Sequence, residues 1–196
     1  KSIYLFSKLP IQELHGKKIA LTNISATSVG LVRIIMSRYY GIIPEYFTSA
    51  PELGAMLREA DAALLIGDDA LRAKYRPDER LYIYDMGNEW KQFTGLPMVF
   101  AVWAIRKDFV NRQPDQVRLI KNMFIESMNY SLANIQAVAE KAAQWEEFSA
   151  DYLVDYFNSL KFDFDAGKQE GLLEYYRQAF EQGLLDEIPP LQVLDI

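Results

Sequence analysis

The sequence contains no cysteine and only one histidine, His15. Without cysteine, disulfide bonds, cysteine-ligated metal sites and thiol nucleophiles are all excluded. A single histidine also excludes a histidine-cluster metal site and disfavours a Ser-His-Asp triad. Because His15 lies in the polar stretch Leu14–Lys17, ahead of an apolar run, we interpret it as a solvated loop residue.

Basic residues are in the minority: 21 Lys and Arg stand against 27 Asp and Glu, for a formal net charge of −6. A broad nucleic-acid-binding surface needs clustered Lys and Arg for its phosphate contacts, so this class of function is disfavoured. An anionic ligand would have to be held by a local site. No apolar run approaches the roughly 18 residues that span a bilayer, so no membrane association is predicted.

Apolar residues make up 50% of the 196 residues, enough to fill a sizeable core. Between residues 17 and 85, short apolar runs alternate with helical patterns, which is typical of β-α-β units and predicts an α/β fold with a parallel sheet. Residues 29–40 carry a helical apolar stripe, and Ser49 to Glu52 reads as a capping box that opens a helix over 51–60. The predicted strands are 19–21, 45–47, 62–66 and 81–84.

The remainder of the chain is mostly helical in pattern. Met98–Ile105 is a continuous apolar run and predicts a buried strand, whereas residues 160–164 alternate as a short strand. Helices are predicted over 114–130, over 132–145 with Ser131 as its cap, after Ser149, and over 168–181, closed by Gly183. Residues 2–7 also read as a buried strand, but without a preceding partner, so we expect a further N-terminal portion outside this sequence.

Four hydroxyls and one amide lie within the seven residues Thr22 to Ser28, between a predicted strand and a predicted helix. The free backbone N–H groups and the dipole of a helix start attract an anion, and hydroxyls add donors without adding charge. A carboxylate is therefore a candidate ligand here. The alternative is that Thr27 or Ser28 merely caps the helix.

Two acidic residues follow predicted strands at the carboxyl ends where open α/β sheets place ligands. Asp68 is a candidate for positioning a hydroxyl or for proton transfer, but it could equally cap the helix that starts near Ala70. Asp85 has the same two interpretations, so no general base is assigned.

Aromatic residues are numerous, and most of them, including the pair Tyr175 and Tyr176, fall at helical spacing that favours core packing. Trp90 and Phe93 differ because they lie between a glycine turn and a Gly-Leu-Pro corner, where they either wall a cleft or pin a chain crossing. Phosphate-loop, dinucleotide and calcium motifs are missing, so neither a cofactor nor a metal is predicted.

Three motifs together resemble a known family: the Ser-x-Thr-Ser turn at Ser25 to Ser28, the Leu-Ile-Gly-Asp strand end at Asp68, and the Asp-x-Gly-x-x-Trp-x-x-x-Thr-Gly-Leu-Pro corner that runs from Asp85 to Pro97. They are similar to those of the chorismate dehydratases of the futalosine route to menaquinone. The resemblance runs from Lys1 to about Phe164. It implies that Ser2 lies against the ligand and that Ser25, Thr27 and Ser28 hold a carboxylate. The complete set of predicted substrate contacts adds Asn23, Asp68, Thr94 and Gly95.

The resemblance also implies an α/β fold of the two-lobed periplasmic-binding-protein type, with an incomplete first lobe. In that scheme residues 1–12 and 98–196 belong to the first lobe and residues 13–97 form the second. The family has further N-terminal residues that form much of the first lobe and contribute an Asn to the active site. A cytoplasmic enzyme, with a homodimer as an option, is the expectation.

The implied reaction converts chorismate to 3-[(1-carboxyvinyl)oxy]benzoate by loss of water. Chorismate has two carboxylates, so its enzyme needs two anion sites but no redox cofactor. Since the motifs contain no obvious strong base, we hypothesise that the enolpyruvyl carboxylate of the substrate takes the proton. Two alternatives share the fold: a non-catalytic solute-binding protein for a small carboxylate, and the related naphthoate-forming enzyme of the same pathway.

Overall fold

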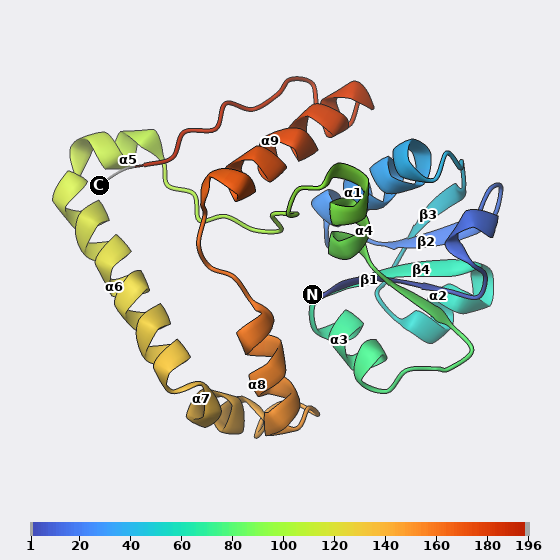
Figure 1. Cartoon of the computed structure of the whole chain (residues 1–196), viewed down its shortest axis with the longest axis horizontal. Helices are drawn as coiled ribbons and strands as arrows, with labels where there is room; N and C mark the ends of the chain where they lie inside the picture. Colours follow the sequence, from blue (N-terminus) through green and yellow to red (C-terminus); the bar gives the residue numbers. More distant parts are fainter. Residues whose placement is uncertain (1, 195–196) are drawn as a thin grey trace. The chain divides into compact units, whose positions relative to one another are not determined.

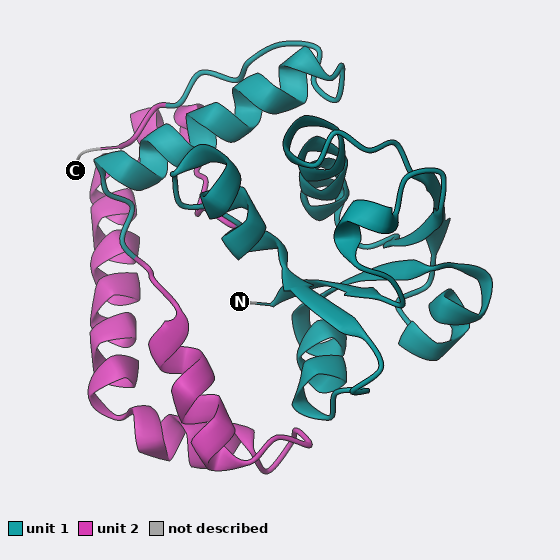
Figure 2. Ribbon diagram, turned by 45° about the vertical axis from the view of Figure 1, so that its right-hand side comes forward, with its two compact units in different colours: residues 1–100, 163–191 teal, residues 101–162, 192–196 magenta. Residues whose placement is uncertain are grey.

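The structure is a computed structural model that describes residues 2–194. It divides into two compact units, residues 1–100 with 163–191 and residues 101–162 with 192–196 (Figure 2). No helix in the described range is long and apolar enough to cross a bilayer. Each unit is considered by itself below.

The first unit is built on a five-stranded sheet in the order β3-β2-β4-β1-β5 (Figure 1). Strand β2 pairs in parallel with β3 and β4, whereas β1 pairs antiparallel with β4 and β5. Four strands therefore run in one direction and β1 runs against them, so the sheet is mixed. The α/β class is confirmed, and the four strands predicted between residues 17 and 85 do share one direction. The strands are β1 (Ile3–Ser7), β2 (Lys18–Thr22), β3 (Glu45–Ser49), β4 (Ala62–Ile66) and β5 (Tyr82–Asp85).

Both faces of the sheet are covered by helices, which explains the continuous apolar runs in its central strands. Because side chains alternate along a strand, Leu5 of β1 enters one core and Phe6 enters the other. One face packs against α1 (Ala26–Ile34), the π-helical segment η2 (Ile35–Tyr39), α4 (Met86–Thr94) and α9 (Ala166–Glu181). The other packs against α2 (Leu53–Glu59) and α3 (Gly67–Tyr75) (Figure 1).

The start of α2 differs from the predicted capping box. The carboxylate of Glu52 accepts hydrogen bonds from the amides of Gly54 and Ala55 at 2.9 and 2.6 Å, so Glu52 is the N-cap. The prediction that Ser49 caps the helix is wrong, because Ser49 is the last residue of β3.

Segment 1–12, expected apart from residues 13–97, contributes the strand β1 to their sheet. Ile3 to Ser7 pair on one side with β4, and Tyr4 to Ser7 pair on the other side with β5. Helix α9, although it comes from the far end of the sequence, also packs in this unit. The unit therefore holds more of the chain than residues 13–97.

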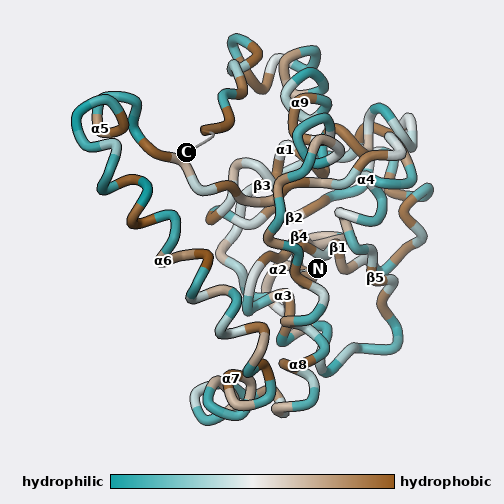
Figure 3. The backbone as a smooth tube through the Cα atoms, turned by 60° about the vertical axis from the view of Figure 1, so that its left-hand side comes forward, coloured by the Kyte–Doolittle hydropathy of each residue, from teal (hydrophilic) through white to brown (hydrophobic). Residues whose placement is uncertain are grey.

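The second unit is helical, with α5 (Lys107–Arg112), α6 (Pro114–Ala133), α7 (Ile135–Ala142) and α8 (Ala150–Ser159). Hydrophobic and hydrophilic residues alternate with the turns of α6 (Figure 3). Ser131 lies inside α6, so its predicted capping role is wrong. The predicted strands at 98–105 and 160–164 are also absent from the described structure. The reason is that a strand needs a neighbour for its backbone hydrogen bonds, and no described strand pairs with either segment.

Candidate functional site

One edge of the five-stranded sheet collects most of the polar residues that the sequence singles out. Strands β2, β4 and β5 reach this edge at Thr22, Ile66 and Asp85, because all three run in the same direction. The antiparallel strand β1 begins there, since Ile3 is the register partner of Ile66. Open α/β sheets bind their ligands at the edge formed by the carboxyl ends of the parallel strands.

The residues that the sequence predicts as substrate contacts fall into two groups. Ser2 precedes β1, and its carbonyl oxygen accepts a hydrogen bond from the amide of Gly67 at 2.8 Å. The segments that follow β2 and β4 bring further candidates to the same edge. Together they are Ser2, Asn23, Ser25, Thr27, Ser28 and Asp68. Thr94 and Gly95 lie apart from them, at the far end of α4, one helix length or about 13 Å from Asp85.

The turn from β2 into α1 is held by a pair of serines. Ser25 is the N-cap: its Oγ accepts from the Ser28 amide at 3.2 Å and donates to Ser28 Oγ at 2.9 Å. Ser28 is buried, whereas Asn23 and Thr27 are exposed. The interpretation that Thr27 or Ser28 caps the helix is therefore wrong, since Ser25 does so.

The exposed part of this turn is suited to an anion. The amides of Ala26 and Thr27 lie in the first turn of α1, where an α-helix provides no internal acceptor. They add their N–H groups to the positive end of the helix dipole. With the exposed Asn23 amide and Thr27 hydroxyl nearby in the chain, the turn offers several uncharged donors to a carboxylate.

The two acidic residues have different positions. Asp68 is exposed in the first turn of α3, whose N-cap is Ile66, so the N-cap interpretation of Asp68 is wrong. Asp85 is the N-cap of α4 and accepts from the amides of Gly87 and Asn88 at 3.0 and 3.2 Å. The capping interpretation of Asp85 is confirmed.

The Thr-Gly-Leu-Pro corner is closed by its own threonine and glycine. Thr94 Oγ1 donates to the carbonyl oxygen of Trp90 at 2.9 Å and accepts from the Leu96 amide at 3.1 Å. Gly95 has φ of 76°, a left-handed conformation that glycine adopts without penalty at a helix C-terminus. Trp90 is fully buried and packs edge-on against Phe93, so it pins the crossing and does not wall a cleft.

His15 lies at the opposite edge of the sheet. It is an exposed residue before β2, and its Nδ1 accepts from the amide of Ile43, which precedes β3, at 3.3 Å. Its interpretation as a loop residue is confirmed. The five residues of β2 span about 16 Å, which separates His15 from the turn after Thr22.

Sequence reasoning missed the contacts that α9 makes with this region. The hydroxyl of Tyr175 donates to the carbonyl oxygen of Thr27 at 3.0 Å, across 148 residues of sequence. Burial raises the pKa of Tyr175 to about 12. The helical spacing of Tyr175 correctly predicts a core position, but no local pattern indicates which carbonyl its hydroxyl reaches.

The described residues offer no side-chain cluster of the kind that binds a metal ion. Within residues 2–194, no cluster of three or more His, Cys, Asp or Glu side chains is placed to hold a metal ion. The donors at the sheet edge are instead backbone amides, hydroxyls and one side-chain amide, which suit an anionic ligand.

Comparisons with known proteins place the chain in a family. The model of a family described as menaquinone biosynthesis matches residues 1–181. The chorismate dehydratase of Thermus thermophilus is 31% identical over an alignment of 157 residues that covers 73% of this chain. The aligned part spans 55% of the length of that relative. Since the family model covers most of the sequence, the chain belongs to the menaquinone biosynthesis family.

Proposed function

We propose that the protein takes part in dehydrating chorismate to 3-[(1-carboxyvinyl)oxy]benzoate, as a lyase of menaquinone biosynthesis. The observation that carries the proposal is the 31% identity to a chorismate dehydratase. The match to the menaquinone biosynthesis family over residues 1–181 supports the same pathway. The activity is proposed because the alignment spans only 55% of the relative.

The chemistry of the reaction fits the donors at the sheet edge. Chorismate carries two carboxylates, and the Asn23 to Ser28 turn offers amides and hydroxyls to one of them. Loss of the ring hydroxyl and of a neighbouring C–H proton leaves an aromatic ring, whose stability drives the reaction. The protein then has to orient the substrate, exclude water and stabilise the leaving hydroxyl.

Roles are proposed for the residues at the edge. Ser2, Asn23 and Thr27 would contact substrate, and the half-buried Ser25 with the buried Ser28 would shape the turn. Asp68 is the exposed carboxylate of this edge. The two candidate proton acceptors are therefore Asp68 and the enolpyruvyl carboxylate of the substrate. Asp68→Asn distinguishes the two: a loss of kcat of about a hundredfold or more favours Asp68, and an unchanged kcat favours the substrate carboxylate. Thr94 and Gly95 would fix the corner.

The resemblance further supports a two-lobed architecture of the periplasmic-binding-protein type, with the five-stranded unit as one lobe. In such proteins ligand binding closes the lobes about a hinge. Small-angle scattering with and without chorismate tests this, and an unchanged radius of gyration would argue against it. A cytoplasmic location and a homodimer belong to the same proposal, and light scattering measures the latter.

The direct test is incubation of the full-length protein with chorismate. We expect a product with the mass of chorismate less one water and with the ultraviolet absorption of a substituted benzoate. Recovery of intact chorismate, with protein shown to be folded, would contradict the proposal.

Thr27→Ala tests the Asn23 to Ser28 turn, called the anion turn below, because Thr27 is exposed and is not the helix cap. We expect chorismate to bind about tenfold more weakly, with an unchanged melting temperature. The matched control is Ser149→Ala. Ser149 is the N-cap of α8, and its Oγ accepts a hydrogen bond from the Tyr152 amide at 3.2 Å. This control should lower stability and leave chorismate affinity unchanged.

A further inference from the structure

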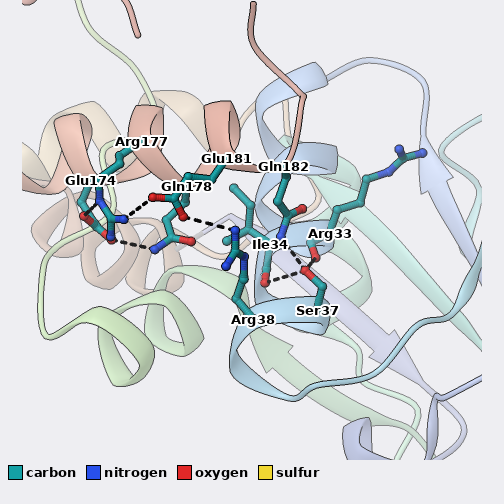
Figure 4. Close-up of polar contacts among 9 residues, drawn as sticks. All are labelled: Arg33, Ile34, Ser37, Arg38, Glu174, Arg177, Gln178, Glu181 and Gln182. Carbon is teal, nitrogen blue, oxygen red and sulfur yellow. Dashed lines mark hydrogen bonds and ion pairs between the residues drawn. The ribbon is translucent and has the colours of Figure 1, made fainter. Parts of the chain in front are cut away.

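Helix α9 lies along α1 and η2 and runs in the same direction. Near its end, Arg38 pairs with Glu181 at 3.2 Å, and the side-chain amide of Gln182 donates to Ser37 Oγ at 2.5 Å (Figure 4). Near its middle, Tyr175 reaches the first turn of α1. The ion pair is exposed and adds little to stability, so the buried contacts must hold the helices together.

The first buried contact joins Tyr175 to the start of α1. Tyr175 is 7% exposed, its ring packs edge-on against Trp90, and its hydroxyl donates to the Thr27 carbonyl. Gly30 leaves the space for it, because a Cβ at this position would lie 2.7 Å from the Tyr175 hydroxyl oxygen. A side chain on α9 thus holds the peptide that follows Thr27.

The second buried contact joins α9 to the corner after α4. A Cβ on Gly171 would lie 2.1 Å from the carbonyl oxygen of Pro97, so at this point the backbone of α9 touches the Thr94 to Pro97 corner directly. At Gly167, one turn earlier, a Cβ would have only one neighbour within 4 Å, Oδ1 of Asp165, the N-cap residue of α9, at 3.5 Å. The approach therefore requires glycine at Gly171 and not at Gly167.

We propose that α9 is a positioning element for the candidate site, with Tyr175 and Gly171 as its positioning residues. Tyr175 fixes the anion turn through Thr27, and Gly171 fixes the corner through Pro97. The two residues are four apart on one helix, so their separation of about 6 Å along its axis sets the turn and the corner relative to each other. The expected effect of these residues on chorismate binding rests on the proposed function, whereas their effect on the conformation of the turn does not.

The main test is Tyr175→Phe, which keeps the ring and removes the hydroxyl. We expect the KM for chorismate to rise about three- to tenfold, with kcat within about twofold, since a misplaced anion turn weakens binding. Tyr176→Phe is the control, because it removes the hydroxyl of the neighbouring residue and should leave both constants unchanged. A Tyr175→Phe enzyme with wild-type KM would overturn the proposal.

Hydrogen exchange on the free protein gives a second readout that needs no substrate. In Tyr175→Phe, the amides of residues 25–29 should exchange several-fold faster, whereas those of β4 stay unchanged. Equal acceleration in both would show that Tyr175 only stabilises the fold, and would overturn the positioning role. If wild-type protein fails to convert chorismate but residues 25–29 respond, the proposed function fails and the positioning role stands.

Gly171→Ala tests the corner, with Gly167→Ala as the matched control in the same helix. The former should accelerate exchange at residues 94–97 and raise KM, and the latter should change neither. Should Gly171→Ala not fold, Tyr175→Phe still decides the proposal. A folded Gly171→Ala protein with wild-type exchange at the corner would contradict it.

Discussion

At the scale of single residues, the most demanding contact is a buried carboxylate paired with a tyrosine. Glu89 of α4 is 7% exposed, and the Tyr40 hydroxyl donates to its Oε2 at 2.5 Å. Burial is the main reason that the pKa of Tyr40 is raised, and the hydrogen bond and negative charge of Glu89 raise it further. Because Glu89 is buried and Tyr40 is half-buried, the carboxylate depends on the Tyr40 hydroxyl for this hydrogen bond.

Tyr40→Phe should therefore destabilise the protein by about 1–3 kcal/mol, since it leaves the Glu89 carboxylate without its partner. Urea unfolding measures the change. Tyr39→Phe is the matched control, because Tyr39 is 38% exposed and its hydroxyl makes only a 3.5 Å contact to Gln92. Equal stability of the two variants would show that the pair contributes nothing.

At the scale of elements, the packing of α9 on α1 depends on one glycine facing one hydroxyl. Gly30→Ala should cost about 1–3 kcal/mol, because its Cβ would overlap the Tyr175 oxygen. In a Tyr175→Phe background the oxygen is absent and the next ring atom is 3.8 Å away. There the alanine should cost nothing, or gain about 0.5–1 kcal/mol from its better helix propensity.

A double-mutant cycle measured by urea unfolding tests this coupling. Repeating the cycle with Tyr176→Phe should leave the full cost of Gly30→Ala in place. If Gly30→Ala were equally costly in the Tyr175→Phe background, the hydroxyl would not be the group that excludes the methyl.

At the scale of the whole molecule, buried and half-buried tyrosines make the fold sensitive to alkali. Burial raises the pKa of Tyr46 and of Tyr175 from 10.0 to about 12, and it raises that of Tyr40 as well. Arg33, which lies 5.2 Å from the Tyr46 ring centre, opposes the shift of Tyr46. Above about pH 10 the unfolded chain loses protons that the folded chain retains, so stability falls as pH rises.

The melting temperature should be level up to about pH 9 and should fall between about pH 10 and pH 12. Tyr175→Phe should show a shallower fall, because phenylalanine does not ionise. Spectroscopic titration of all 12 tyrosines in one step near pH 10, without unfolding, would contradict the assignment.

Much of the first unit could be predicted from local patterns. Apolar runs at Ile19 and Leu64 predict buried strands, and the helices between them require right-handed crossovers that place these strands parallel. That direction alone brings Asn23 to Ser28 and Asp68 to the same edge. The helix caps were predicted less well, because Ser, Thr, Asp and Glu near a helix start compete for the same amides.

The sequence by itself determined which segments are apolar, which are helical, and that the polar turns follow strand ends, because these properties depend on neighbours in the chain. The tertiary structure decided that β1 runs antiparallel between β4 and β5, and that Met98–Ile105 pairs with no described strand. It also decided that Tyr175 reaches Thr27. An apolar run predicts only that a segment is suited to burial, and residues 100–105 are exposed in the described structure although they are apolar. Which segments become buried, and against which partner, is decided by the packing of segments far apart in the chain.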